Sequence, residues 1–523
     1  MVKKISTLAL AGLLALPAMA AAGAGSTTDM QSQIDALTKQ LEQLKAQMAG
    51  MKAAPAAAPS GDLAERLGAL EERSEAWDFA SRIQLGGDFR ARGDYYNADI
   101  AGGGEVENDT VFTNRLRLDM RAKALENVEF KGRLAMYKTW GMQNLADGMG
   151  TFTMDGASTR QPQDNILRVD RAFVNWNNIA DSPVWFSIGR RPTTDGPPNH
   201  LRMGSDQRMA TPTAYMDWPF DGVSVGYAYN NLFGVEDSPG RVRVCWGRGF
   251  ENGLNDADSS HLNDVDFAGV SWDIYKKGNR FAYLQSFMAF NVFNYPTDAN
   301  GPIGIDYAMG TWMPEQIDLM MGWPAGSAAA SGMGARQNIG DLLHTSAVYM
   351  DKFENLNYFA SLGWSRTDPN DNGMFNDMFS MLAGAAGPNT SSENGYHAHI
   401  GVRYDIPDSA FKLGAEYNYG SEYWVSMTPG HDDLYQSKLA TRGNVYEVYG
   451  IYDIPGGEAI SKLGKAFIRL GYQHYDYEYT GSGDWNYRPY DIDSMQAAGL
   501  AGMMPSMAIE DADQIYMTFE AYF

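Results

Sequence analysis

Basic side chains recur at every second position along three consecutive stretches of the sequence. Residues two apart share one face of a β-strand, so each stretch would present a basic face. The basic positions are Arg90, Arg92, Arg115, Arg117, Arg121, Lys123, Lys131 and Arg133, and the acids Asp88, Asp119 and Glu129 lie among them. Such a wall would concentrate anions within a Debye length of an aqueous path and lower the barrier to their passage. These basic residues, with Asp119, are our candidate pore-lining residues that set selectivity.

The same residues have a structural interpretation that stands beside the functional one. Opposite charges directly across neighbouring strands stabilise a sheet and fix its register. Basic residues outnumber the acids in this set, so we expect the pairing to be incomplete. Both interpretations stay open, because a partly paired ladder can also attract anions.

A long, basic stretch rich in Pro and Gly follows at residues 190–218, RRPTTDGPPNHLRMGSDQRMATPTAYMDW. A loop of this kind either folds into a channel and narrows it, or stays in solvent. If it folds inward, its cationic side chains would line the constriction. Those candidates are Arg190, Arg191, His200, Arg202 and Arg208.

Motifs for catalysis and metal binding are absent from the sequence. There is no G-x-S-x-G, H-E-x-x-H, P-loop or metal-spaced cysteine pair. His397 and His399 share a strand face, but no third ligand lies nearby in sequence, so we interpret them as polar lumen residues. The lone Cys245 excludes a disulfide framework and a c-type haem. We predict no catalytic residues, no metal site and no cofactor, and a protein that is not an enzyme.

The elements that must carry these side chains are β-strands, because the hydrophobic pattern has a period of two from Ser81 onward. Leu116 and Leu118, for example, alternate with Arg115 and Arg117. Alternation alone fits either a soluble β-sandwich or a membrane β-barrel. Strands of roughly 10 residues are long for a soluble protein and suit a tilted membrane crossing.

The connections between the predicted strands alternate in length, and this alternation favours the barrel over the sandwich. Tight turns are predicted at residues 125–127, 275–279, 352–355 and 406–409, and long loops at 141–164, 191–218, 296–341, 368–394, 421–442 and 481–512. An up-and-down membrane barrel has short turns at one end, long loops at the other and an even strand count. We therefore predict an all-β fold, a transmembrane antiparallel up-and-down β-barrel of about sixteen strands over residues 81–523.

Three further patterns support the barrel. Residues 513–523 alternate as one strand that ends on Phe523, like the closing strand that barrel-assembly machinery reads. Acids gather in predicted loops, and aromatic residues gather near strand ends, where interfacial girdles would lie. The acids include Asp94, Asp99, Glu105, Glu107 and Asp109, and the aromatics include Tyr95, Tyr96, Trp140, Trp176, Trp185, Trp218, Tyr227, Trp364, Trp424 and Tyr477.

The N-terminal residues predict export and oligomerisation. Residues 1–20 have a positive start, a short apolar run and small residues at a cleavage site, which is typical of a secretory signal peptide. Residues 21–52 carry an apolar a/d heptad series, which favours a coiled coil over a single surface helix and predicts a trimer. Residues 53–62 form a Pro/Ala linker, and residues 63–80 a short helix that leads into the barrel.

The charge balance limits the partners. A formal net charge of −23 argues against nucleic acid. A solvated acidic surface suits outer-membrane lipids whose head groups are bridged by divalent cations. We expect the barrel in the outer membrane of a Gram-negative bacterium, with the coiled coil in the periplasm.

Several segments resemble one known family. GRLAMYKTWG at 132–141, DRAFVNW at 170–176 and PVWFSIGRRPTTDGPPNHLR at 183–202 are similar to an uncharacterised family of porin-like outer-membrane proteins from proteobacteria. The resemblance spans nearly the whole chain and implies a signal peptide, a short coiled coil and a barrel, but it carries over no site residues. The layout is also similar to that of trimeric phosphate-type anion porins. Some porin-like barrels sheathe multihaem cytochromes, which implies a possible cytochrome partner.

Together, these observations predict an outer-membrane porin for passive diffusion of small hydrophilic solutes or ions, with a mild preference for anions. The alternative is the barrel sheath of a porin–cytochrome electron-transfer conduit. A third hypothesis is a coiled-coil-tethered protein that anchors the envelope. At about sixteen strands a barrel leaves an aqueous channel unless something fills it.

Overall fold

The computed structural model describes most of the chain from residue 82 onward. The described residues are 82–141, 162, 165–191, 196–203, 216, 220–251, 262–278, 280–294, 337–428, 433, 437–456, 464–503 and 507–523. The predicted signal peptide, coiled coil, linker and short leading helix, at residues 1–80, lie outside this part of the chain.

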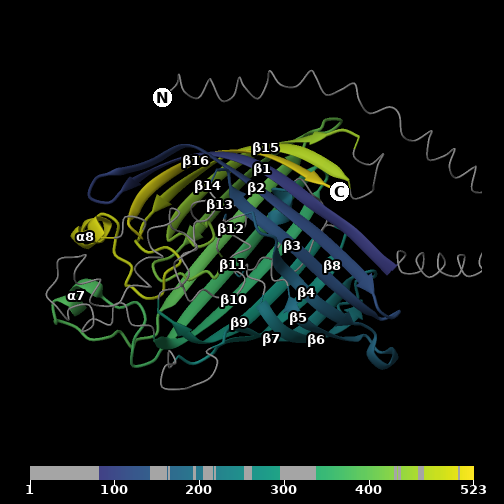
Figure 1. The fold of residues 1–523 in the computed structure, drawn as a ribbon, viewed down its shortest axis with the longest axis horizontal. Coiled ribbons are helices and arrows are strands. Elements are labelled where there is room, and N and C mark those ends of the chain that lie inside the picture. Colours follow the sequence, from purple (N-terminus) through teal and green to yellow (C-terminus); the bar gives the residue numbers. More distant parts are fainter. Residues whose placement is uncertain are drawn as a thin grey trace, which may run out of the picture. The chain divides into compact units, whose positions relative to one another are not determined.

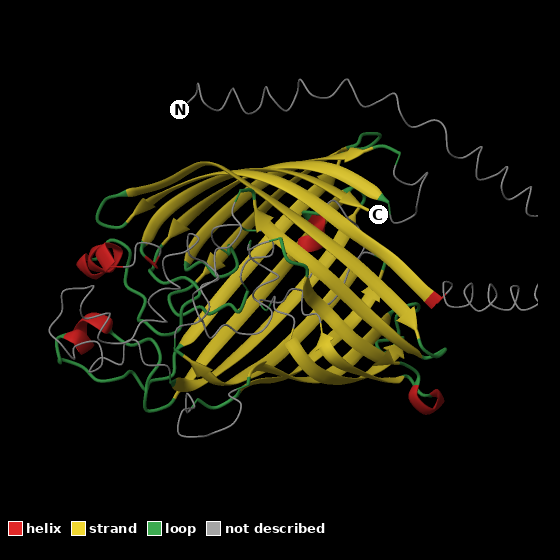
Figure 2. Ribbon diagram, in the orientation of Figure 1, coloured by secondary structure: helices red, strands yellow, loops and turns green. Residues whose placement is uncertain are grey.

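Sixteen antiparallel strands form one closed barrel (Figures 1 and 2). Each strand pairs with its neighbours in sequence, and β16 pairs with β1 to close the ring. The predicted all-β fold and strand number are therefore confirmed. The strands are β1 (Ile83–Ile100), β2 (Glu105–Lys123), β3 (Val128–Thr139), β4 (Arg168–Trp176), β5 (Val184–Arg191), β6 (Phe220–Asn230), β7 (Pro239–Phe250), β8 (Val265–Lys277), β9 (Arg280–Phe293), β10 (Asn338–Phe353), β11 (Leu356–Pro369), β12 (Asn394–Asp405), β13 (Phe411–Gly420), β14 (Gly443–Ile454), β15 (Lys465–Tyr477) and β16 (Ile509–Tyr522).

Short helices lie in the connections between the strands. They are η2 (Ile179–Asp181), η3 (Asn199–Leu201), α7 (Met378–Leu382) and α8 (Met495–Met503). Within the described residues, no helix is long and apolar enough to cross a membrane.

Loop length separates the two ends of the barrel as predicted. Residues 124–127, 354–355 and 406–410 make tight turns at the end where β1 begins and β16 finishes, and two residues separate β8 from β9 there. Residues 370–393, 421–442 and 478–508 make long connections at the other end. One connection at the long-loop end differs, because β1 extends to Ile100 and turns through Gly102, Gly103 and Gly104. All three glycines have positive φ, which permits the tight turn.

The β1–β2 hairpin corrects the prediction that its acids lie in a loop. The acids named above belong to strands, from Asp94 in β1 to Asp109 in β2. Asp94 is buried and pairs with Arg92, whereas Glu105, Glu107 and Asp109 are exposed. The strand continues because Tyr96 and Ala98 fill buried, inward positions between these acids.

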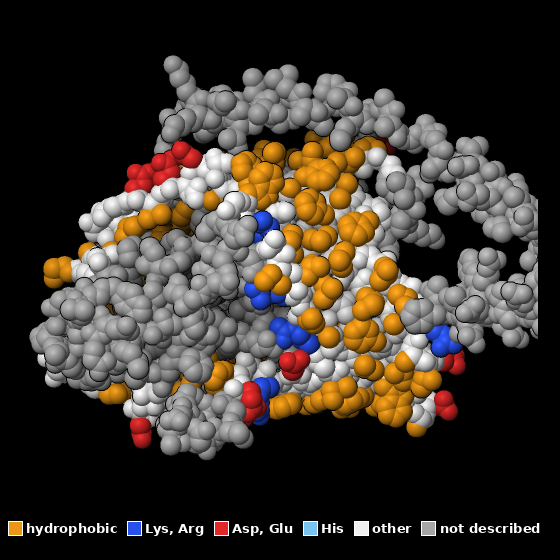
Figure 3. All heavy atoms as spheres, in the orientation of Figure 1, with side chains coloured by type: hydrophobic (Ala, Val, Ile, Leu, Met, Phe, Trp, Pro, Cys, Tyr) orange, Lys and Arg blue, Asp and Glu red, His pale blue; other side chains and the backbone are white. Residues whose placement is uncertain are grey.

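The wall of the barrel has an apolar outer row and a polar inner row. Leu118 and Val244 are exposed on the outside, at 36% and 59% of their surface. Arg117, next to Leu118 in β2, is only 2% exposed. Figure 3 shows hydrophobic side chains spread over the outer face of the strands. The alternation in sequence therefore separates an apolar exterior from a charged interior.

Loop residues pack against the inner wall at the long-loop end. Trp424 and Trp485 are fully buried, although both lie in connections between strands. A cluster with Val265, Phe293 and Leu342 joins strands β8 to β10 to Trp485. Three aromatics that we predicted for interfacial girdles, Tyr96, Trp424 and Tyr477, are instead buried here, while Trp140, Trp176 and Tyr227 are exposed. Part of the lumen is thus filled by the chain itself.

Candidate functional site

The candidate pore-lining residues lie together on the inner faces of β1, β2 and β3. Asp88 accepts from two of them, Arg115 at 3.1 Å and Arg117 at 2.7 Å. Asp88 and Arg117 are direct cross-strand partners, so strand register brings their opposite charges together. All three side chains are buried.

A second group of ion pairs lies nearer the short-turn end. Arg121 and Lys131 both contact Glu129, at 2.6 and 2.7 Å. Arg133 contacts Asp119 at 2.7 Å, and the two are cross-strand partners. Lys123 ends β2 and is exposed.

Acids from outside the predicted set complete much of this pairing. Asp94 contacts Arg92 at 2.7 Å, Asp170 of β4 lies 3.8 Å from Arg133, and Glu520 of β16 lies 3.8 Å from Arg115. The guanidinium groups also stack on rings: Arg92 lies over Tyr516 at 4.5 Å, and Arg90 lies over Tyr137 at 5.2 Å. The expectation of incomplete pairing counted only three acids, because Glu520 lies at the far end of the sequence. The ladder is thus more nearly neutral than its sequence indicates, and its role in selectivity stays a prediction.

Residues 196–203, which we call the crossing segment, lie buried inside the barrel. They belong to the connection between β5 and β6. In a ring of sixteen strands, the β5–β6 position faces the β13–β14 position. The carbonyl oxygens of the segment accept hydrogen bonds from that opposite side, at Leu201 from Arg403 of β12 (3.0 Å) and at Arg202 from Arg469 of β15 (2.6 Å). The chain that leaves β5 therefore reaches the opposite wall.

The crossing segment reaches deep into the barrel. The carbonyl of Met203 accepts from Lys465 at 2.6 Å, and Lys465 is the first residue of β15, at the short-turn end. Met203 packs with Ile451 and Phe467, and Leu201 packs with residues of β9, β10 and β11. Hydrogen bonds and apolar contacts thus hold the segment on several strands.

Arg202 joins the crossing segment to a buried ion network, which we call the lumen network. Its members are Arg202, Glu416, Asp433, Lys438 and Glu447. Arg202 contacts Glu447 at 2.8 Å and Asp433 at 3.5 Å. Lys438 contacts Glu447 at 2.6 Å and also pairs with Glu416. Three carboxylates face two cations, so the five groups carry one excess negative charge, and each has a charged partner in place of water.

Neighbouring side chains complete the hydrogen bonding of the network. Tyr516 donates to Glu447 at 2.6 Å, and the amide of Gln473 donates to Asp433 at 3.0 Å. Burial opposes the charge on Asp433, but Arg202 and Lys438 outweigh it and hold the pKa of this carboxyl below its usual value. Asp433 therefore stays charged at neutral pH and helps to hold the crossing segment through Arg202.

The predicted constriction residues do not all lie together in the structure. His200 and Arg202 are buried in the crossing segment. Arg190 and Arg191 instead end strand β5. Arg190 belongs to the outward row and lies 3.9 Å from Asp221, whereas Arg191 points into the barrel. Arg208 lies outside the described residues.

His397 and His399 lie in the lumen as interpreted from sequence. His399 contacts Glu416 at 3.0 Å, and His397 contacts Asn418 at 2.5 Å and stacks on Trp424. In the described parts of the chain, no group of three or more His, Cys, Asp or Glu side chains is arranged to hold a metal ion.

The sequence analysis did not identify most of the lumen network. Glu416 and Glu447 stand in strands otherwise rich in Tyr and Val, and an isolated carboxylate on the inward row was the available signal. Asp433 and Lys438 lie in a loop between those strands, where no periodicity indicates which way a side chain points.

A comparison with solved structures finds outer-membrane proteins that are very distant in sequence. OprB of Pseudomonas putida has 10% identity and a TM-score of 0.41, covering 86% of this chain and 96% of that one. OmpT of Vibrio cholerae has 10% identity and a TM-score of 0.38, with coverage of 84% and 97%. OmpF of Salmonella typhi, in a complex with daunomycin, has 11% identity and a TM-score of 0.39, with coverage of 84% and 97%.

A comparison with curated protein sequences finds no significant match. One family model does match, over residues 105–523, which include all of the barrel except β1. This agrees with the resemblance to an uncharacterised family. The chain belongs to the family described as protein of unknown function (DUF3373).

Proposed function

We propose that this protein is an outer-membrane porin that lets small hydrophilic solutes or ions diffuse passively through a narrowed lumen. Three features support the proposal. The barrel is closed, so no strand edge is left unpaired in a membrane. Its outer row is apolar and exposed, and its inner row is polar. This is the division that a lipid exterior and an aqueous path require.

The observation that carries the proposal is the crossing segment. A barrel of this size is wide enough for an aqueous channel. Residues 196–203 occupy part of that space and are held by Arg403, Arg469 and Lys465 on the far side. An inward loop fixed in this way limits the size of the solutes that can pass, so we propose a narrow pore.

The ion preference of the pore follows from its charges. The basic ladder on β1 to β3 is largely paired with carboxylates. Paired arginines attract passing anions less than free ones do, because the neighbouring carboxylate cancels most of their field. We therefore propose a mild preference for anions.

The filled lumen favours a channel over a cytochrome sheath. A sheath must leave room for a second folded protein. Here Trp424, Trp485 and the crossing segment occupy the interior, and the members of the lumen network pair with one another. The inner wall of this barrel therefore packs against the protein's own loops.

Orientation and assembly complete the proposal. We place the short turns and both termini on the periplasmic side, the coiled coil in the periplasm and the exposed outer row against lipid. The N-terminal heptads would join three barrels into a trimer.

Recording from planar bilayers tests the proposed function. Purified protein, shown to be folded by its faster migration on unboiled gels, should give stable openings in groups of three. The reversal potential across a KCl gradient should show a slight preference for chloride. Folded protein that gives no openings would contradict the porin proposal, and it would lead us to seek a partner inside the barrel.

A further inference from the structure

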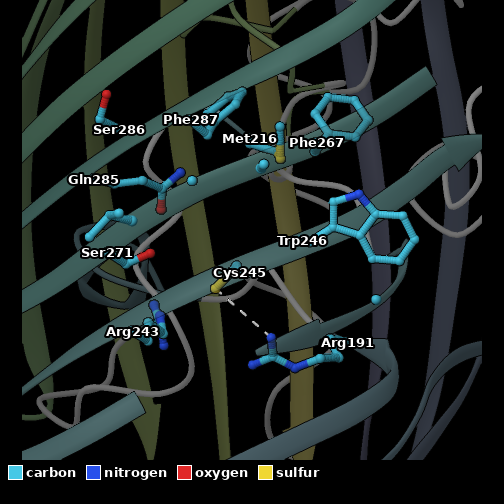
Figure 4. Close-up of a pocket in the computed structure, with 14 residues that line it drawn as sticks. Arg191, Met216, Arg243, Cys245, Trp246, Phe267, Ser271, Gln285, Ser286 and Phe287 are labelled. Carbon is cyan, nitrogen blue, oxygen red and sulfur yellow. Dashed lines mark hydrogen bonds between the residues drawn. The ribbon is translucent and has the colours of Figure 1, made fainter. Parts of the chain in front are cut away.

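A cavity of about 70 Å³ lies on the inner side of β5 to β9. Figure 4 shows its lining, with Arg191 and Arg243 near Cys245 and with Ser271 and Gln285 beyond. Arg243, Ser271 and Gln285 are successive cross-strand partners on β7, β8 and β9. Strand register therefore places three polar side chains in one row along the cavity.

Arg191 reaches this row from β5. Its Nη1 lies 4.0 Å from the Cys245 sulfur, and its Nε donates to the hydroxyl of Ser187 at 3.0 Å. Cys245 and Arg243 are two residues apart on the same face of β7. The two guanidinium groups therefore lie beside one cavity, with the thiol between them along the wall.

Neither arginine forms an ion pair with an acid among the described residues, although Asp273 is close enough to act on Arg243 electrostatically. Arg243 is only 5% exposed, and its one hydrogen bond there is a long one of 3.5 Å to the hydroxyl of Tyr283. Arg191 contacts only neutral groups. A guanidinium offers five N–H donors, so most of the donors on each side chain have no protein acceptor.

The two acids nearest the cavity form ion pairs with other arginines. Asp273, two residues from Ser271 on β8, pairs with Arg241. Asp221 faces Arg190 on the outside of the wall. The cavity is thus a place where positive charge exceeds negative charge, in contrast to the paired ladder on β1 to β3.

We propose that this cavity is a binding site for a small inorganic oxyanion, such as phosphate or sulfate, on the path through the barrel. An inward-facing charge without a counter-ion is costly, and a bound anion offsets that cost. Guanidinium groups match oxyanions because their paired N–H groups donate to two oxygens at once. The hydroxyl of Ser271 lines the same cavity and is hydrogen-bonded to Tyr283.

Gln285 supplies a further donor. Its amide oxygen accepts from Tyr283, so its NH₂ group is left to donate. The volume also fits, because one water needs about 10–15 Å³ measured in this way, so the cavity holds several atoms of that size. This inference rests on the proposed function, since it places the site on the solute path.

Binding of inorganic phosphate to the purified, detergent-solubilised full-length protein tests the site. Equilibrium dialysis with radiolabelled phosphate should detect saturable binding to the wild-type barrel. R191Q and R243Q should each weaken binding at least tenfold. R190Q should bind as the wild type does, because Arg190 belongs to the outward row of the same strand. Wild-type protein that binds no phosphate would overturn the site, whether or not the variants fold.

Chloride current through planar bilayers separates this proposal from the proposed function. Phosphate in the bath should reduce the wild-type current, and R191Q, which removes the less buried arginine, should reduce that block. Wild-type binding that is lost in R191Q, with no current at all, would support the site and contradict the porin. Current that phosphate does not change, with no phosphate binding, would support the porin and contradict the site.

Discussion

At the level of single residues, charged side chains inside this barrel lie next to side chains of opposite charge. Arg117 meets Asp88 across one strand pair, and Arg133 meets Asp119 across the next. In the lumen network, Glu447 is approached by Arg202, Lys438 and Tyr516. Removing one partner of such a buried pair is costly because the remaining charge stays out of water. Each cation therefore has a measurable effect on stability.

The substitution R202A should destabilise the barrel. It removes the contacts to Glu447 and Asp433, and we expect a loss of about 3 kcal/mol in the free energy of unfolding. The loss lies at the low end of the range for buried pairs because Lys438 still faces Glu447. Urea unfolding of protein refolded into detergent micelles measures this change.

R190A is the matched control for R202A. Arg190 lies 3.9 Å from Asp221, whose side chain is 65% exposed, so this pair should contribute less than about 1 kcal/mol. Equal effects of the two substitutions would show that the lumen network does not hold the crossing segment.

At the level of elements, the closure of the ring depends on β1 and β16. Gly87 and Phe523 exchange two backbone hydrogen bonds, of 2.9 and 3.0 Å. The ring of Phe523 lies over Gly87, and a Cβ at this glycine would lie 2.9 Å from that ring and closer still to the carbonyl oxygen of Arg117. No side chain fits at this position without moving the backbone of β2 or the ring of Phe523.

The substitution G87A should therefore weaken closure of the barrel. Overpacking of this kind costs about 1–3 kcal/mol. We expect the shift in mobility on unboiled gels to occur at a lower temperature than in the wild type. The control is G450A, in which a Cβ on β14 meets only Leu413, at an ordinary contact distance of 3.7 Å. If G87A and G450A melt alike, close packing at the β1–β16 seam does not limit stability.

The elements of the fold were largely predictable from sequence, and the contents of the lumen were not. Alternation with a period of two places Arg117 inside and Leu118 outside whatever the partner strand is. The prediction that Asp94 and Asp99 lie in a loop was wrong because β1 continues to Ile100, with Tyr96 and Ala98 buried. The contact between Lys465 and the Met203 carbonyl joins residues far apart in sequence, and no local pattern encodes it.

For the whole molecule, we attribute assembly into a trimer to the N-terminal heptads. We predict that replacing Leu37 and Leu44 with Asp in the full-length protein breaks the trimer, because two charges would enter the apolar seam. Light scattering coupled to size-exclusion chromatography should then report monomers. Replacing Lys39 and Ala46 with Asp, on the outer face of the same heptads, should leave the trimer intact. Monomers from the wild-type chain would contradict the assignment.

The crossing segment sets the size limit of the pore in this account, and one measurement tests that directly. Residues 196–203 would be replaced by a Gly/Ser sequence of equal length, and liposome swelling rates would be measured for neutral solutes of increasing size. A matched replacement in the short β6–β7 turn, residues 231–238, serves as the control. We predict that the first variant admits larger solutes than the wild type and the control do. The same size limit in all three proteins, each shown to be folded, would contradict a pore narrowed by this segment.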